Sequence, residues 1–387
     1  MSWDKAKISD ICSDIFDGPH ATPPVSKDGA IFLGISNITP DGHLDLSNPK
    51  YINEADLPKW TKRVTPLEGD IVFSYEATLN LYAIIPPGFH GCLGRRMALI
   101  RPNENKVLGK FLFYYFFSDE WRKTIAENTV IGATVDRIPL IRFPNFPVSY
   151  PSIEKQFKIV EVLSSYDDLI KNNRKQIKLL EEAAQRLYKE WFVDLRFPSH
   201  ETTPIIDGIP QGWEERNIDD VFSVQYGKML PTSLLVPNGE YPVYGANGVI
   251  GYYTKANCFD YVTLITSRGN GSGDVLRTHH KASFVTNNSF VVLPKETYGH
   301  FELPFAYHLM KTLDFKSICT GSAQPQLTNK SISMLNVIVP TSAVVKAFCN
   351  IANPMFAKIE LLYKQIQAAA EARDCLLPKL MNGEIEV

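Results

Sequence analysis

The sequence predicts a mixed α/β (α+β) protein with two globular halves, two long antiparallel coiled-coil helices and an internal pseudo-twofold repeat. Three features of the 387 residues support this prediction. Short motifs occur twice, the later motifs keep one constant offset of 189, and each copy is followed by a helical heptad pattern. The repeated positions are Trp3, Ile8 and Asp10 with Trp213, Ile218 and Asp220, then Gly132, Ile138 and Pro151 with Gly321, Leu327 and Pro340.

The repeat divides the chain into four segments. Residues 1–150 and 201–340 are predicted to be globular, and residues 151–200 and 341–387 to be helical spacers. In the globular segments, short β-rich runs alternate with turns rich in Gly, Pro and Asn. The β-rich runs lie at 70–73, 97–100, 262–266 and 289–293, helices are expected at 110–128 and 304–314, and residues 198–211 are predicted to be a linker.

Bulk composition is that of an ordinary globular protein, with 44% hydrophobic and 21% charged residues. The net charge of −2 does not indicate nucleic-acid binding, which would have to depend on local clusters or on a positively charged partner. None of the six cysteines forms a C-x-x-C pair, and the longest apolar run, residues 111–117, is too short to span a bilayer. We therefore expect a cytoplasmic protein without metal, disulfide or membrane segment.

The two helical segments carry matching apolar seams. Two polar residues, Asp167 and Arg174, stand where apolar side chains are expected, and Pro354 should begin or kink a helix. The first seam residues are Leu163, Ile170, Ile177 and Ala184, and the second are Met355, Ile359, Leu362 and Ile366.

Each long helix could pack on its own globular half, or the two could pack against each other. The stretch 156–191 would be about 54 Å long as a helix, which exceeds the span of one half and favours antiparallel pairing of the two helices. Such a pair would suit two half-sites about one turn of DNA, roughly 34 Å, apart.

Four strings of residues resemble the specificity subunits of type I restriction-modification systems. The string 188–198 (YKEWFVDLRFP) resembles the end of their central conserved region, and 373–385 (RDCLLPKLMNGEI) resembles the end of their distal one. The strings 132–139 and 321–328 resemble the segments that close each target-recognition domain.

This resemblance implies that residues 1–150 and 201–340 are target-recognition domains, each contacting one half of a bipartite sequence in double-stranded DNA. It implies that the helices set the spacing and dock two N6-adenine methyltransferase subunits, and it allows for a translocating restriction subunit. It implies no catalytic site here; S-adenosylmethionine and ATP are expected on the partner subunits.

Three motifs that could suggest chemistry have simpler interpretations. The stretch 353–356 lacks the second proline of an adenine-methyltransferase motif and lies in the heptad pattern. The glycine-rich stretch 269–273 lacks the Lys-Ser/Thr of a phosphate loop and predicts a hairpin, although such a loop could still touch DNA. The adjacent histidines His279 and His280 have no matching second pair of metal ligands, so they predict a surface turn rather than a metal site.

Candidate DNA contacts are Arg, Asn and neighbouring polar residues at strand ends, because Arg and Asn bind guanine and adenine edges in pairs of hydrogen bonds. Solvated loops and turn-forming asparagines explain each one individually as well. The candidates in the first half are Ser74, Tyr75, Glu76, Arg95, Arg96 and Arg101, and those in the second are Tyr244, Asn247, Ser267, Arg268, Asn270, Asn287 and Asn288.

Three hypotheses follow, in this order. The first is a noncatalytic DNA-recognition subunit, the second a coiled-coil scaffold or adaptor without sequence-specific DNA recognition, and the third an enzyme in its own right. The second predicts no sequence preference even with partners, and the third predicts activity of the isolated chain.

Overall fold

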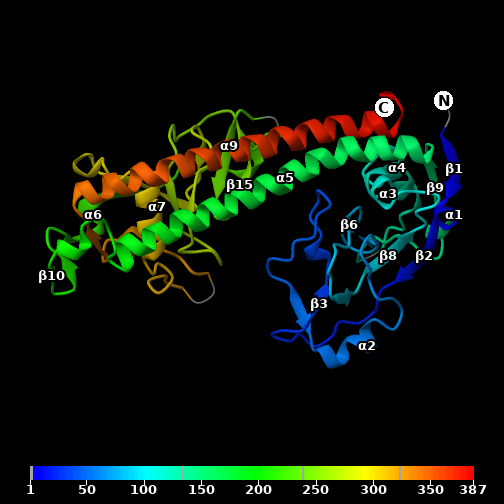
Figure 1. Ribbon diagram of the computed structural model, residues 1–387, viewed down its shortest axis with the longest axis horizontal. Coiled ribbons are helices and arrows are strands. Elements are labelled where there is room, and N and C mark those ends of the chain that lie inside the picture. The colour runs from blue at the N-terminus through cyan, green and yellow to red at the C-terminus, as the bar shows by residue number, and fades with distance from the viewer. Residues whose placement is uncertain (1–2, 133, 238, 322–323) are drawn as a thin grey trace. The chain divides into compact units, whose positions relative to one another are not determined.

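The structure is a computed structural model that describes residues 3–132, 134–237, 239–321 and 324–387. It separates into unit 1, Met1–Leu169 with Ala368–Val387, and unit 2, Ile170–Gln367. The two long helices, α5 (Ile153–Tyr188) and α9 (Ser342–Met381), each contribute residues to both units (Figure 1). The two units are described one at a time.

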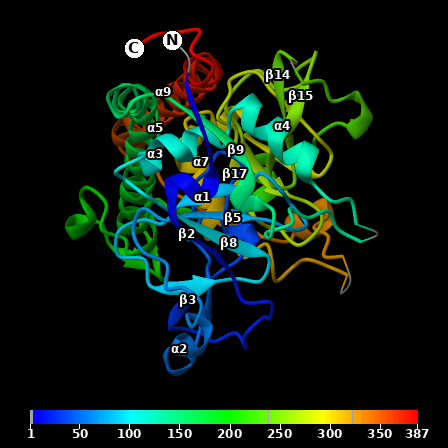
Figure 2. The same ribbon diagram turned by 90° about the vertical axis from the view of Figure 1, so that its right-hand side faces the viewer.

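Unit 1 contains a mixed domain built on three small sheets (Figure 2). The four-stranded antiparallel sheet has the order β2-β8-β5-β6. The three-stranded sheet has the order β4-β3-β7, and β1 pairs with β9. The strands are β1 (Asp4–Lys7), β2 (Cys12–Asp17), β3 (Ala30–Leu33), β4 (Lys50–Ile52), β5 (Ile71–Ser74), β6 (Tyr82–Ile84), β7 (Gly91–Leu93), β8 (Met97–Pro102) and β9 (Pro147–Tyr150).

Short helices complete the core of unit 1. Where the sequence predicted one helix over 110–128, there are two, because the hydroxyl of Ser118 caps a second helix by accepting a hydrogen bond from the Trp121 N–H at 3.2 Å. Trp121 is fully buried and donates its ring N–H to the Tyr82 hydroxyl at 2.9 Å. The helices are α1 (Ile8–Ile11), α2 (Leu57–Trp60), α3 (Gly109–Tyr115) and α4 (Asp119–Asn128).

Unit 2 repeats this plan. Its four-stranded sheet β13-β19-β16-β17 matches the first, its three-stranded sheet is β15-β14-β18, and β12 pairs with β20. In both three-stranded sheets one strand pair is parallel. The strands are β12 (Glu214–Asn217), β13 (Phe222–Tyr226), β14 (Tyr241–Gly245), β15 (Gly248–Tyr253), β16 (Thr263–Thr266), β17 (Val275–Arg277), β18 (Phe284–Val285), β19 (Ser289–Pro294) and β20 (Asn336–Val339).

The helices of unit 2 also follow the pattern of unit 1. The predicted helix over 304–314 is α7 (Leu303–Thr312), and α6 (Ile218–Val221) and α8 (Asn329–Ile332) are short. The predicted linker 198–211 is partly ordered as a small hairpin of β10 (Ile205–Ile206) and β11 (Ile209–Pro210). Helix α9 begins at Ser342 and continues through Pro354, so that proline does not start the helix.

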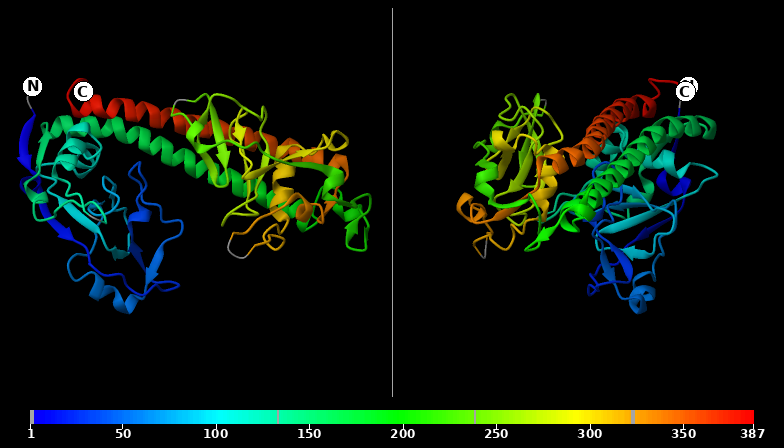
Figure 3. Two further views of the ribbon diagram at one scale, coloured as in Figure 1. Left: turned by 180° about the vertical axis from the view of Figure 1, so that it is seen from behind. Right: turned by 60° about the vertical axis from the view of Figure 1, so that its left-hand side comes forward.

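Within each unit, α5 and α9 pack antiparallel. In unit 2, Ile177 of α5 forms a buried cluster with Ile359 and Leu362 of α9, and Asn173 donates to Gln365 at 3.2 Å. In unit 1, Leu163 of α5 shares a core with Leu377 of α9, and the ends of the described chain come together where Trp3 lies beside Gly383 (Figure 3). Of the predicted seam, Leu163, Ile170, Ile177, Ala184, Ile359 and Leu362 are buried, and Met355 and Ile366 are half-buried.

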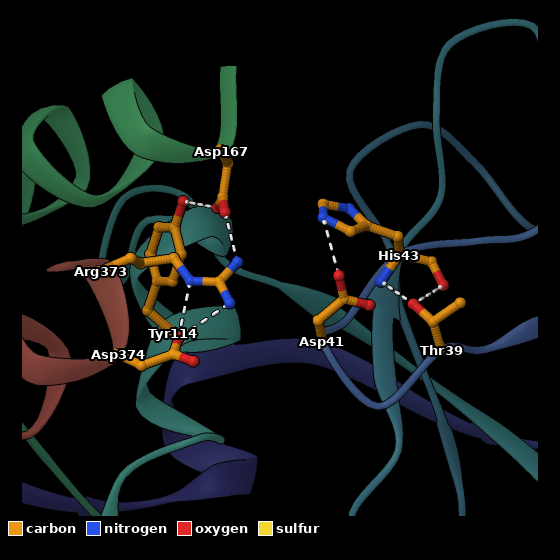
Figure 4. A network of polar contacts seen from close by, with 7 residues as sticks. All are labelled: Thr39, Asp41, His43, Tyr114, Asp167, Arg373 and Asp374. Atoms are coloured by element: carbon orange, nitrogen blue, oxygen red, sulfur yellow. Dashed lines mark hydrogen bonds and ion pairs between the residues drawn. The ribbon is translucent and has the colours of Figure 1, made fainter. Parts of the chain in front are cut away.

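The polar position Asp167 in the first seam has a specific partner in unit 1. Asp167 of α5 accepts hydrogen bonds from Arg373 of α9 at 2.7 Å and from the Tyr114 hydroxyl of α3 at 2.5 Å (Figure 4). Burial and the charge of Asp167 raise the pKa of Tyr114, so the phenol stays a donor. This network fastens the first domain to both helices.

Unit 2 fastens its domain to the helices through Arg277 at the end of β17. Arg277 is only 4% exposed, forms an ion pair with buried Glu360 of α9, and lies 3.8 Å from Glu181 of α5. Its guanidinium also stacks over Phe356 at 4.6 Å. Although burial opposes ionisation, the hydrogen bond from His279 and the charge of Arg277 keep the pKa of Glu360 below its ordinary value.

Arg277→Met should leave Glu360 buried without its counter-ion and lower the free energy of unfolding by about 3 kcal/mol. The double variant R277M/E360M should recover most of that loss, because a buried ion pair is often no more stabilising than apolar side chains of similar volume. Urea unfolding followed by circular dichroism measures both changes.

The matched control is Arg216→Met, which removes an exposed guanidinium paired with Glu214 on the surface. This change should cost far less stability than R277M, because an exposed ion pair is screened by solvent and contributes little. Equal losses for R277M and R216M would contradict the role given to the buried pair.

Candidate nucleic-acid interface

At one edge of the four-stranded sheet of unit 1, three loops and one more distant segment meet. Strands β2 and β5 end at this edge and β8 begins there, with Asp17 opposite Ala98 and Ser74 opposite Met97. The Gly18 N–H donates to the Met97 carbonyl at 2.9 Å. We call this set of segments, residues 17–20, 75–80, 94–96 and 130–138 where described, the loop edge of the first domain.

The closing segment, described residues within 130–138, is tied to the loop that follows β5. The Ile138 N–H donates to the Tyr75 carbonyl at 2.7 Å, and the Ala77 N–H donates to the Asp136 carbonyl at 3.0 Å. A further bond runs from the Tyr75 N–H to the Arg96 carbonyl at 3.2 Å. The loop after β5 is therefore held from both sides.

The second domain builds its loop edge, residues 226–229, 267–274, 286–288 and 320–327 where described, with equivalent bonds. The Ser267 N–H donates to the Asn288 carbonyl at 2.8 Å, and the Leu327 N–H donates to the Ser267 carbonyl at 2.9 Å. The Gly269 N–H donates to the Pro325 carbonyl at 3.1 Å. These bonds match those of the first domain one for one, so Tyr75 corresponds to Ser267 and Ala77 to Gly269.

The predicted residues of the first half divide into two groups. Ser74 and Tyr75 are buried, and burial, followed by the charge of Asp17, raises the pKa of Tyr75 to about 12. Arg101 donates two hydrogen bonds of 2.8 Å to the buried carboxylate of Asp70. These three side chains therefore have structural roles. By contrast, Arg95 is exposed and Glu76 and Arg96 are half-buried at the loop edge.

The predicted residues of the second half divide in the same way. Tyr244 is buried, and its hydroxyl accepts a hydrogen bond from the His279 N–H at 2.8 Å. Ser267 is buried, and its hydroxyl donates to the Asn287 carbonyl at 3.2 Å. The remaining five lie at or beside the loop edge: Asn247, Arg268 and Asn270 are exposed, and Asn287 and Asn288 are half-buried.

Several exposed or half-buried side chains at the loop edges were missed from sequence. Met229 is 78% exposed just after β13, beside Lys228. Arg137 and Gln326 are one 189-residue offset apart and form equivalent bridges, Arg137 with Glu76 and Gln326 with Arg268. That offset could have identified them. Beside the first loop edge, a hollow of about 210 Å³ is lined by several cations, Lys59, Lys62 and Arg63.

The alternative chemical motifs have structural explanations. Residues 269–273 form the turn between antiparallel β16 and β17, as predicted. Residues 353–356 lie inside α9, and His279 and His280 contact Glu360 and Tyr244 rather than forming a bare surface turn. Among the described residues, no group of three His, Cys, Asp or Glu side chains could hold a metal ion. No helix in the described ranges is long and apolar enough to cross a membrane.

Comparison with known proteins decides the family. The sequence model described as "Type I restriction modification DNA specificity domain" matches residues 24–182 and again residues 210–371. The chain belongs to this family. The two matches correspond to the two halves of the repeat, and membership places DNA target recognition rather than catalysis in this chain.

Individual relatives agree with this assignment. The chain is 27% identical over 418 residues to the type I restriction enzyme MjaIX specificity subunit of Methanocaldococcus jannaschii, covering 100% of this chain and 94% of that protein. It is 23% identical over 479 residues to the HindI specificity subunit of Haemophilus influenzae, covering 99% of each.

A solved structure supports the fold. The S subunit of a type I restriction-modification system from M. genitalium superposes with a TM-score of 0.57 at 18% identity, covering 98% of this chain and 96% of that one. The predicted mixed α/β fold class and the resemblance to specificity subunits are confirmed, and the adaptor hypothesis is not favoured.

Arg101→Ala should mainly lower stability, whereas Arg95→Ala should mainly weaken DNA binding. R101A removes the bidentate partner of a buried carboxylate and should lower the free energy of unfolding by about 2 kcal/mol without changing which bases are recognised. R95A removes an exposed cation and should leave stability within about 0.5 kcal/mol while weakening DNA binding. Urea unfolding and a DNA-binding titration of the assembled complex measure the two effects. A specificity change in R101A at unchanged stability would contradict this assignment.

Proposed function

We propose that this chain is the DNA-recognition subunit of a type I restriction-modification complex, in which each loop edge contacts one half of a bipartite target in double-stranded DNA. One observation carries the proposal: the two loop edges share the same backbone hydrogen bonds but present different side chains. A shared scaffold with different exposed groups suits two related ligands that differ in sequence.

The long helices supply the remaining parts of the proposal. They set the spacing between the half-sites and dock two methyltransferase subunits, and a restriction subunit can join. Besides the buried seam, α5 and α9 carry exposed apolar side chains, which often mark partner surfaces. These are Phe157, Leu169, Leu179, Ile351 and Leu361.

The chemistry is proposed to lie on the partners. S-adenosylmethionine and ATP would bind the methyltransferase and restriction subunits, with no cofactor on this chain, and the complex would act in the cytoplasm. The curated relatives are named as specificity subunits of restriction enzymes, which supports this division of labour.

Deleting this chain should abolish a bipartite pattern of N6-methyladenine in cells that keep the methyltransferase subunit. Sequencing that detects methylated adenine across the genome, with and without the chain, measures this directly. Because both half-sites and the spacer appear in one motif, the same map defines the target. An unchanged map, with the complex shown to assemble, would instead support the adaptor hypothesis.

The isolated chain should bind target DNA weakly, at about micromolar affinity or worse at physiological salt, because its net charge is −2 and phosphate neutralisation supplies much of the affinity. Adding the methyltransferase subunits should tighten binding at least tenfold and increase the salt dependence. Fluorescence anisotropy across a salt series tests both. Nanomolar binding by the chain alone would contradict the prediction.

A further inference from the structure

Glu76 and Arg268 occupy the same place in the two domains. Each follows a buried residue, Tyr75 or Ser267, whose N–H and carbonyl make the equivalent backbone bonds described above. Each also bridges to the equivalent residue of the closing segment. Equivalent backbones therefore carry a carboxylate in one domain and a guanidinium in the other.

The carboxylate of Glu76 lies beside an arginine at the first loop edge. Arg96 lies 3.7 Å from it, and the Arg96 backbone adopts a left-handed conformation with φ of 70°. Ala77, the next residue, is also left-handed at φ 72°. Left-handed backbone is costly for residues other than glycine and is often found at ligand sites. The strained backbones of Ala77 and Arg96 lie at the same loop edge as Glu76, where Arg95 and Arg96 add positive charge.

A carboxylate at this position needs a donor on the DNA. Phosphates repel it, so Glu76 cannot contribute to the sequence-independent part of binding. On the base edges of the major groove, the matching donor is the N4 amino group of cytosine. Arg96 beside it offsets part of the repulsion from the DNA backbone.

Arg268 suits a different base. It is exposed, and it makes no ion pair with the described residues of the chain, unlike Arg96 and Arg101. A free guanidinium next to a base edge pairs best with O6 and N7 of guanine.

We propose that Glu76 specifies a cytosine in the half-site of the first domain and that Arg268 specifies a guanine at the corresponding place in the other half-site. This inference rests on the proposed function, since it names the bases that the two loop edges distinguish. Each of the two positions is then a C·G base pair. Glu76 contacts the cytosine of one pair, and Arg268 contacts the guanine of the other.

The test replaces each residue by glutamine, which has a similar reach and pairs with adenine. The wild-type motif is mapped first with the complete methyltransferase complex. A plasmid library with every target position varied in turn is then methylated by the wild-type, E76Q and R268Q complexes and sequenced for N6-methyladenine.

E76Q should relax one C·G position of a single half-site, so that methylation of the adenine-containing variant rises about tenfold or more relative to the wild-type target. R268Q should do the same at a G·C position of the other half-site. The controls Asp4→Asn and Arg216→Gln make equivalent chemical changes on β1 and β12, which precede the strands leading to the loop edges, and should leave the motif unchanged.

The outcomes are distinct. The assignment of the substituted residue would be overturned by relaxation at an A·T position, by relaxation in both half-sites, or by an unchanged motif. For Glu76, loss of all methylation in E76Q while D4N is active would also overturn it. Absence of any bipartite wild-type motif would instead overturn the proposed function itself.

Discussion

The arrangement of each domain depends on the hydrogen bonds that join the closing segment to the loop after the third strand of the four-stranded sheet. In the first domain the Ile138 N–H meets the Tyr75 carbonyl, and in the second the Leu327 N–H meets the Ser267 carbonyl. Without a partner for these buried backbone groups the loops would not be fixed. These bonds tolerate different lengths of intervening chain, since 63 residues separate Tyr75 from Ile138 and 60 separate Ser267 from Leu327. The interiors are free to differ, with 129 residues from Trp3 to Gly132 but only 108 from Trp213 to Gly321.

Polar residues in the helices mark the places where the domains are attached. Asp167 interrupts the apolar seam of α5 because it receives Arg373 and Tyr114 in unit 1, and Glu360 of α9 is buried because it receives Arg277 in unit 2. Apolar contacts at these places would tolerate many orientations, whereas a buried charged pair is satisfied in few. We interpret both networks as devices that fix orientation more than they add stability.

The parts predicted from sequence are those encoded by local patterns. Strands such as 97–100 and the long helices follow from periodicity, and the repeat reveals that the domains share a plan. The roles of individual side chains were harder to predict from the sequence. Arg101 resembles a DNA contact until Asp70, 31 residues away in sequence, is placed beside it. Ser267 precedes exposed Arg268, and Tyr244 lies in β14 three residues before exposed Asn247, yet both side chains are buried, and a single sequence does not reveal this difference between near neighbours.

The two loop edges combine a shared backbone scaffold with different side chains, and this division also affects the affinity for DNA. A nearly neutral chain cannot bind DNA tightly by charge alone, so loop-edge groups such as Arg268 and Glu76 contribute through selectivity rather than through total attraction. Selectivity is favoured when the backbone that carries those groups is fixed, because a mobile segment loses entropy on ordering and adapts to several bases. The paired backbone bonds fix the backbone at both positions, and Arg96 lies 3.7 Å from the carboxylate of Glu76, whereas the exposed Arg268 side chain forms no ion pair with the described residues. If cationic partners supply the attraction to phosphate, the two loop edges can diverge in sequence without changing how strongly the assembly holds DNA.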